Sequence, residues 1–311
     1  AESARKAARA GELAGQALAE LDLDAKGSKA LALLLARESV LTTWRDEGTV
    51  TDAAMFALNK TVREASPWLM NLPRHRHVAM VSSATFSPDG ERIVTASYDN
   101  TAKVWDAASG SQLLTLSGHI SPVWSAVFSP DGEHIVTASS DNTAKVWDAA
   151  SGDELLTLSG HGARVSSAVF STDGERIVTA SYDHTAKVWN AQTGAELLTL
   201  SGHTNWILSA AFSPNGERIV TVSSDTPAKV WNAQTGAELL TLSGHSAPVS
   251  SAAFSPDGER IVTTSEDNTA KVWNAQSGAE LLTLSRHSAP VNSAAFSPDG
   301  ERIVTANYDN T

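Results

Sequence analysis

Residues 118–159 read GHISPVWSAVFSPDGEHIVTASSDNTAKVWDAASGDELLTLS. Segments rich in β-branched and other apolar residues alternate here with turn signals. In the turn 129–132 (Ser-Pro-Asp-Gly), proline presets its own φ and glycine supplies a positive φ. The pattern predicts four short strands, at Val123–Phe128, His134–Ser139, Ala144–Asp148 and Leu155–Leu158.

The same unit recurs along the chain. Histidines stand at 42-residue steps from His77 to His287, and phenylalanines keep this step from Phe86 to Phe296. Four antiparallel strands in about 40–45 residues are typical of a propeller blade. We therefore predict an all-β propeller over residues 67–311 that is truncated in the sixth repeat. Because seven such blades need about 294 residues, we expect an incomplete arc of about six visible blades out of seven or more.

Two short motifs identify the type of blade. Glycine-histidine pairs such as Gly118-His119 open the copies, and tryptophan-aspartate pairs such as Trp147-Asp148 close the third strand. Both motifs resemble those of the WD-repeat β-propeller family, although later copies read tryptophan-asparagine, as at Trp189-Asn190. The first copy lacks the glycine, which leaves open whether His75 or His77 is its motif histidine.

Four polar positions recur along the copies: a histidine, a threonine 18 residues on, an aspartate four further and, in the first five copies, a tryptophan six beyond that. A catalytic interpretation would make them nucleophile, base and orienting acid. A structural interpretation makes them a hydrogen-bond chain that ties the strands of one blade together, as the family resemblance implies. Repetition favours the structural interpretation, because an enzyme does not need the same triad six times. The tetrad residues are His77, Thr95, Asp99 and Trp105; His119, Thr137, Asp141 and Trp147; His161, Thr179, Asp183 and Trp189; His203, Thr221, Asp225 and Trp231; His245, Thr263, Asp267 and Trp273; and His287, Thr305 and Asp309.

Function is expected where the copies differ. In the family that the repeats resemble, three positions per blade face partners: three and five residues after the motif histidine, and just before the motif aspartate. All three tyrosines of the chain fall in this set, and Tyr, Trp and Arg are enriched at interface hot spots. Two interpretations remain open: these residues bind a partner protein, or they merely fill the rim of the propeller. The candidate partner-binding residues are Met80, Tyr98, Trp124, Arg164, Tyr182, Trp206, Leu208, Glu266, Asn292 and Tyr308.

Residues 1–66 differ in composition, being rich in alanine, leucine and glutamate. Apolar spacing predicts a connector of about three helices, near 3–21, 29–44 and 52–65. This segment resembles the connector that precedes WD repeats in bacterial STAND-type signalling NTPases. The resemblance implies that the chain is a fragment of a larger protein, with any catalytic domain upstream of residue 1. The stretch Leu69–Leu72 resembles a fourth strand and is expected to complete the final blade.

Composition limits the function further. The chain of 311 residues carries a net charge of −12, which argues against binding to nucleic acid or to anionic membranes. It contains no cysteine and no phosphate-loop, zinc-protease or nucleophile-elbow motif, so we expect no enzyme activity, cofactor or metal in this chain. Apart from His75, His134 and His184 are the only histidines of the array outside the tetrads, and they replace an arginine and a turn asparagine.

The sequence thus predicts a protein-interaction scaffold or ligand-sensing module of a larger bacterial signalling protein in the cytoplasm. The alternative is the regulatory tail of an enzyme, a STAND-type NTPase or a kinase, whose catalytic domain lies upstream. Its partner would then be another protein or the protein's own upstream domain.

Overall fold

The computed structural model describes residues 77–307, which form strands and turns and contain no helix. Five antiparallel sheets of four strands are followed by one of two strands, and we number these sheets as blades one to six. The predicted helices of residues 1–66 and the predicted strand Leu69–Leu72 lie outside the described residues.

The strands follow the chain order within every blade. Blade one comprises β1 (Val81–Phe86), β2 (Arg92–Ser97), β3 (Thr101–Asp106) and β4 (Gln112–Ser117); blade two β5 (Val123–Phe128), β6 (His134–Ser139), β7 (Thr143–Asp148) and β8 (Glu154–Ser159). Blade three comprises β9 (Val165–Phe170), β10 (Arg176–Ser181), β11 (Thr185–Asn190) and β12 (Glu196–Ser201); blade four β13 (Ile207–Phe212), β14 (Arg218–Ser223), β15 (Ala228–Asn232) and β16 (Glu238–Leu242). Blade five comprises β17 (Val249–Phe254), β18 (Arg260–Ser265), β19 (Ala270–Asn274) and β20 (Glu280–Leu284), and blade six β21 (Val291–Phe296) and β22 (Ile303–Asn307).

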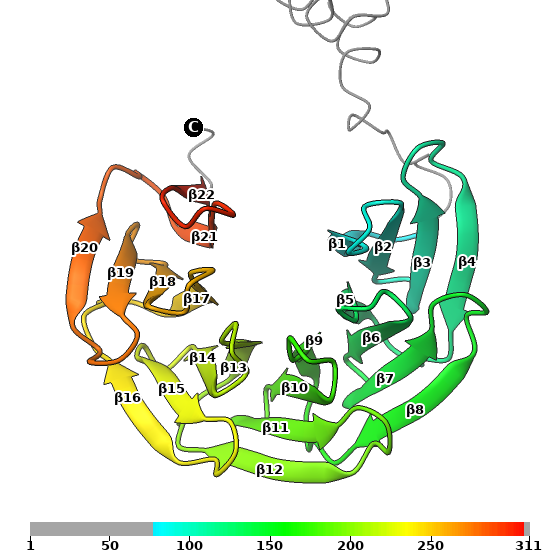
Figure 1. Cartoon of the computed structure of the whole chain (residues 1–311), viewed down its shortest axis with the longest axis horizontal. Coiled ribbons are helices and arrows are strands. Elements are labelled where there is room, and N and C mark those ends of the chain that lie inside the picture. Colours follow the sequence, from blue (N-terminus) through cyan, green and yellow to red (C-terminus); the bar gives the residue numbers. More distant parts are fainter. Residues whose placement is uncertain (1–76, 308–311) are drawn as a thin grey trace, which may run out of the picture. The chain divides into compact units, whose positions relative to one another are not determined.

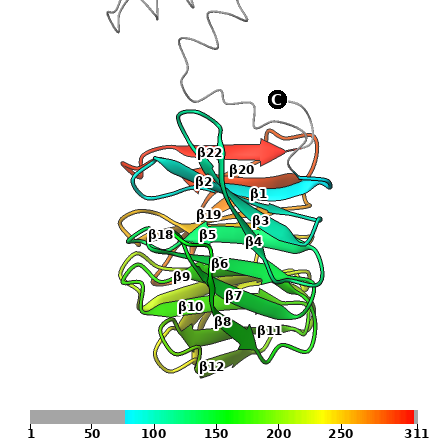
Figure 2. The same ribbon diagram turned by 90° about the vertical axis from the view of Figure 1, so that its right-hand side faces the viewer.

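The blades are arranged in an open arc (Figure 1). The first strand of each blade lies on the inside of the arc and the fourth strand on the outside, and Figure 2 shows successive blades one above another. The arc is open between the β1 blade and the β21–β22 blade. The predicted incomplete, all-β arc is therefore confirmed.

The turn after β5 shows why the strands end where the sequence predicts. Gly132 has φ 74°, a conformation that glycine adopts without steric cost. Its N–H donates to the carbonyl of Ser129 over 2.9 Å, and the N–H of Glu133 donates to Oδ1 of Asp131 over 2.9 Å. The same turn repeats in the other blades, so each first strand turns directly into the second.

A β-bulge interrupts the first strand of every blade. In blade two the pairing of β5 with β6 shifts between Val123 and Ser125, so that Trp124 is the extra residue. A bulge re-aims the side chain of its extra residue. The position five residues after the motif histidine therefore differs in direction from its neighbours along the strand.

The hydrophobic core lies between consecutive blades rather than inside one. Val94 and Val104 of blade one pack in one cluster with Ile135 and Trp147 of blade two, and all four are at most 1% exposed. Equivalent clusters join blades two to three, three to four and four to five. Each blade thus needs a neighbour to bury its apolar face.

Candidate functional site

The structure brings the tetrad side chains of one blade together. In blade two Nδ1 of His119 lies 2.7 Å from Oδ2 of Asp141, and its Nε2 lies 2.7 Å from Oγ1 of Thr137. Nε1 of Trp147 donates to the same threonine oxygen over 2.9 Å. Because the indole can only donate and the carboxylate only accept, the chain runs from indole to threonine to imidazole to carboxylate, with the imidazole proton on Nδ1.

The other tetrads have the same geometry. In blades one, three, four and five the shortest histidine–aspartate, histidine–threonine and tryptophan–threonine distances all lie between 2.7 and 2.9 Å. In blade one His77 makes these bonds, whereas His75 lies outside the described residues. In blade six His287 lies 2.8 Å from Thr305, and Asp309 lies outside the described residues.

Burial decides the charge state of the tetrads. Desolvation lowers the pKa of His119 despite the opposing hydrogen bond to Asp141, which keeps the imidazole neutral at pH 7. Desolvation would raise the pKa of Asp99, but hydrogen bonds from Thr101 and His77 outweigh it and lower this pKa to about 2. Thr137 is 0% exposed, so no substrate can reach the one hydroxyl that a triad would use. The tetrad side chains of blade two thus join its strands through short hydrogen bonds that are largely removed from solvent.

The glycine of the opening motif is explained by the same packing. A Cβ added to Gly118 would lie 2.9 Å from Cη2 of the Trp147 indole, closer than real Cβ contacts come. The side chain of this residue must therefore be absent for the tetrad tryptophan to reach its place.

Five of the predicted partner-binding residues stack on one another across blades one to four. We call Tyr98, Trp124, Arg164, Tyr182 and Trp206 the aromatic–arginine stack. The ring centroids of Tyr98 and Trp124 are 4.7 Å apart, and Cζ of Arg164 lies 3.9 Å from the Trp124 ring and 3.7 Å from the Tyr182 ring. Tyr182 and Trp206 are stacked, with centroids 4.7 Å apart and an interplanar angle of 7°. The guanidinium of Arg164 also bonds the hydroxyl of Tyr182.

The members of the stack differ in exposure. Trp206 is 49% exposed, whereas Trp124 is half-buried and donates its indole N–H to Oγ of Ser140 over 2.6 Å. The bulge in β5 turns Trp124 toward the next blade, where it meets Arg164. Trp124 is therefore part of the contact between blades, and Trp206 is the most exposed member of the stack.

The remaining candidates are dispersed. Met80, Glu266 and Asn292 are exposed, and Tyr308 lies outside the described residues. Leu208 is half-buried and packs against the hydrophobic cluster between blades four and five. It serves packing, so the structure places it apart from a partner surface.

The sequence did not predict a role for the arginines at the start of the second strands, yet these arginines join the blades. Arg92 donates from Nη1 to the carbonyl of Ala149 over 2.9 Å and from Nη2 to that of Gly132 over 2.7 Å, both in blade two. Its Cζ lies 5.1 Å from the centre of the Phe128 ring. We call this set of contacts the interblade arginine clamp. Its sequence signal is the 42-residue recurrence of arginine, broken by His134.

The other odd histidine has a local explanation. His184 is exposed and has φ 71°, as do the asparagines at the equivalent turns, such as Asn100 with φ 68° and Asn142 with φ 70°. It is a turn residue in the left-handed region.

Within residues 77–307 no group of three or more histidine, aspartate or glutamate side chains is arranged to hold a metal ion. No helix in this part of the chain is long and apolar enough to cross a membrane.

Comparison with known proteins agrees with the repeat geometry. The family model "WD domain, G-beta repeat" matches residues 68–106, 110–148, 152–190, 194–232, 236–274 and 278–311. "Dynein assembly factor with WD repeat domains 1" is 45% identical over 42 residues in Xenopus laevis and 43% identical over 42 residues in Danio rerio. Each match covers 14% of this chain and 10% of the relative's length. With six matched repeats over most of its length, the chain belongs to the WD-repeat (G-beta repeat) family.

Proposed function

We propose that the repeats form a protein-binding module whose partner docks on the aromatic–arginine stack. The observation that carries this proposal is the exposed Trp206, held with one ring face against Tyr182 while 49% of its surface stays accessible. Aromatic and arginine side chains that are ordered before binding lose little entropy when a partner arrives. The stack therefore has the chemistry of an interface hot spot.

The stack also explains why the site is confined to one sector of the arc. Blades one to four contribute its members, whereas blade five has Pro248, Ser250 and Glu266 at the corresponding positions. None of these three residues carries an aromatic ring or a guanidinium group. A partner of the stack would thus contact blades one to four and leave blade five free.

The test is a comparison of Trp206→Ser with Leu197→Ser. Leu197 on the outer strand β12 is 48% exposed, nearly the same as Trp206, but lies in no stack. Proteins retained by the immobilised chain from a lysate of its own source would be identified, and their affinity measured with each purified variant. We expect the Trp206 variant to weaken capture at least tenfold and the Leu197 variant to leave it unchanged. Equal affinities would contradict the proposal.

We further propose that the module belongs to a larger bacterial signalling protein, as sensor region or as regulatory tail of a STAND-type NTPase or a kinase. The support is the resemblance of residues 16–22, 31–40 and 48–51 to a STAND-type connector, a segment outside the described residues. The matched relatives are named as assembly factors, which agrees with the broader proposal of a scaffold. An antibody to the repeats should detect a native protein much larger than 32.7 kDa, and its coding sequence should contain a phosphate loop or kinase motifs. A native protein without either would refute the enzyme-tail hypothesis.

A further inference from the structure

The contact between blades two and three lacks the interblade arginine clamp. At three other junctions an arginine of the second strand bonds the next blade. The contacts are Arg92 to Gly132 and Ala149, Arg176 to Gly216 over 2.8 Å and Ala233 over 3.2 Å, and Arg260 to Gly300 over 2.7 Å. Each of these guanidinium groups also lies over a phenylalanine ring of the next blade, with Cζ 5.1 to 5.4 Å from the ring centre. Blade four keeps part of the arrangement, because Arg218 bonds the carbonyl of Ala275.

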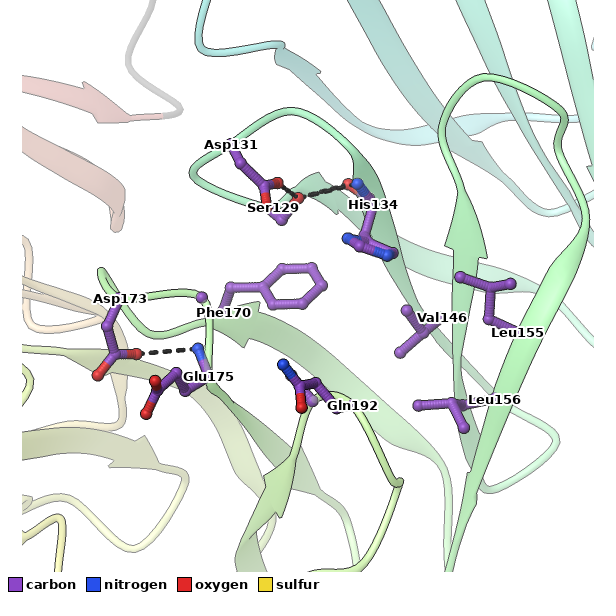
Figure 3. A pocket seen from close by; sticks show the side chains of 12 residues that line it. Ser129, Asp131, His134, Val146, Leu155, Leu156, Phe170, Asp173, Glu175 and Gln192 are labelled. Atoms are coloured by element: carbon purple, nitrogen blue, oxygen red, sulfur yellow. Dashed lines mark hydrogen bonds between the residues drawn. The ribbon is translucent and has the colours of Figure 1, made fainter.

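In blade two the equivalent residue is His134, whose ring is too short to repeat these bonds. The acceptors that a clamp would use are the carbonyls of Gly174 and Ala191, and among residues 77–307 neither has a hydrogen-bond donor. Both residues line a pocket of about 590 Å³ between the two blades, together with His134 and Phe170 (Figure 3). Figure 3 shows the Phe170 ring reaching into this pocket.

The absence of a guanidinium accounts for the difference between this pocket and the pocket at the next junction, between blades three and four. The pocket between blades three and four is lined by Arg176 itself and not by Phe212, because the guanidinium lies over that ring. Between blades two and three Phe170 and Gly174 line the pocket instead. The aromatic face and the acceptors of a clamp are thus present without their cation.

Charge and shape favour a cation with an apolar stem. The carboxylates of Asp131, Asp173 and Glu175 line the pocket, and no lysine or arginine is among its lining residues. Asp173 lies 3.7 Å from a guanidinium nitrogen of Arg176, so Asp131 and Glu175 supply most of the free negative charge. Val146 and Leu155 form an apolar wall that suits a methylene chain.

We propose that this pocket binds the guanidinium group of an arginine side chain from a second protein. The incoming guanidinium donates to the carbonyls of Gly174 and Ala191, stacks over the ring of Phe170 and pairs with Asp131. It occupies the place that the chain's own arginines occupy at other junctions. The site lies at the opposite end of β5 from Trp124, so it is separate from the surface proposed above and does not depend on it.

The probe is N-acetyl-arginine-N-methylamide, titrated into the ¹⁵N-labelled full chain and followed by NMR. We expect saturable shifts of the Gly174 and Ala191 amide signals. The lysine analogue should bind at least tenfold more weakly, because an ammonium cannot bond both carbonyls and stack at the same time. The citrulline analogue, which keeps the shape but not the charge, should bind at least tenfold more weakly as well. Free L-arginine should also bind at least tenfold more weakly, because its α-carboxylate would meet Asp131 and Glu175; tighter binding of free arginine would overturn the assignment to a protein side chain.

Two variants are used, so that the test does not fail if one of them does not fold. His134→Arg should fill the pocket from within and reduce binding of the probe at least tenfold. Arg176→His should open a second site, with new saturable shifts at Gly216 and Ala233. The proposal is overturned if the wild-type chain shows no saturable shift, if lysine and arginine probes bind equally, or if a folded His134→Arg chain binds as well as the wild type. Trp206→Ser should leave this binding unchanged, so failure here and failure of the partner surface are distinguishable.

Discussion

The buried threonine is the residue on which each tetrad depends. Thr137 is 0% exposed and its hydroxyl accepts from the indole of Trp147 while it donates to His119. Removal of either neighbour leaves a buried polar group without its partner, which costs more than the bond itself contributes. The repeat spacing predicted which residues meet here, because the four types can be satisfied together in only one order.

Replacement of Trp147 by phenylalanine tests this dependence. Trp147→Phe keeps most of the ring volume but removes the N–H that Thr137 accepts. We expect the free energy of unfolding to fall by about 1–3 kcal/mol, measured by urea denaturation. Trp206→Phe is the matched control, since its exposed indole makes no hydrogen bond within residues 77–307; it should stay within about 0.5 kcal/mol of the parent. A Trp147 variant as stable as the control would show that the tetrad does not hold the blade.

At the scale of the elements, the sequence predicted strands well and contacts between blades poorly. The four strands expected from residues 118–159 agree with β5 to β8 to within one residue, because proline, glycine and asparagine mark the turns. The sequence placed Trp124 and Arg164 together on the rim, but not in direct contact, since their stacking depends on the bulge in β5 and on the angle between blades. A 42-residue period shows which positions are equivalent, but not which positions of adjacent copies meet.

The interblade arginine clamp gives a prediction at this scale. Arg176→Met keeps the apolar stem of the side chain over Phe212 but removes the two hydrogen bonds to blade four. We expect a loss of about 1–2 kcal/mol in the free energy of unfolding, because both bonds involve a charged donor. Arg302→Met is the control, since the Arg302 side chain is 81% exposed. Equal stability of the two variants in urea would argue that the clamp contributes nothing to the contact between blades.

For the whole molecule, repetition makes small local effects add up. The described arc contains five complete tetrads, and the hydrophobic core is distributed over the junctions between blades rather than gathered in one centre. In such an array stability is approximately a sum of blade and junction contributions. A condition that weakens one tetrad therefore weakens all of them at once, and pH is such a condition.

Acid should destabilise the arc in two steps. The pKa values of His119, His161, His203 and His245 are lowered by burial below the value of 6.5 that applies to an exposed histidine. The unfolded chain therefore binds protons below about pH 6.5 that the folded chain does not, and stability falls as the pH drops. Hydrogen bonds outweigh desolvation at Asp99, Asp183 and Asp267 and lower their pKa from 3.8 to about 2, so a second loss follows between these values.

The pH dependence can be measured as the urea midpoint at pH 7.5, 5.5 and 3. We expect the midpoint to decrease at each step, because both groups of residues favour the folded state only when they have released their protons. His161→Asn should lower the midpoint at pH 7.5, where Thr179 loses its acceptor, but should reduce its change between pH 7.5 and 5.5. His184→Asn, in an exposed turn outside the tetrads, should keep the slope of the parent. A midpoint that is constant or rises as the pH falls to 5.5 would show that the buried histidines are not kept neutral by the fold. A protonated histidine donates from Nε2 as well as from Nδ1, so only the threonine–histidine hydrogen bond of each tetrad would then have to be reversed.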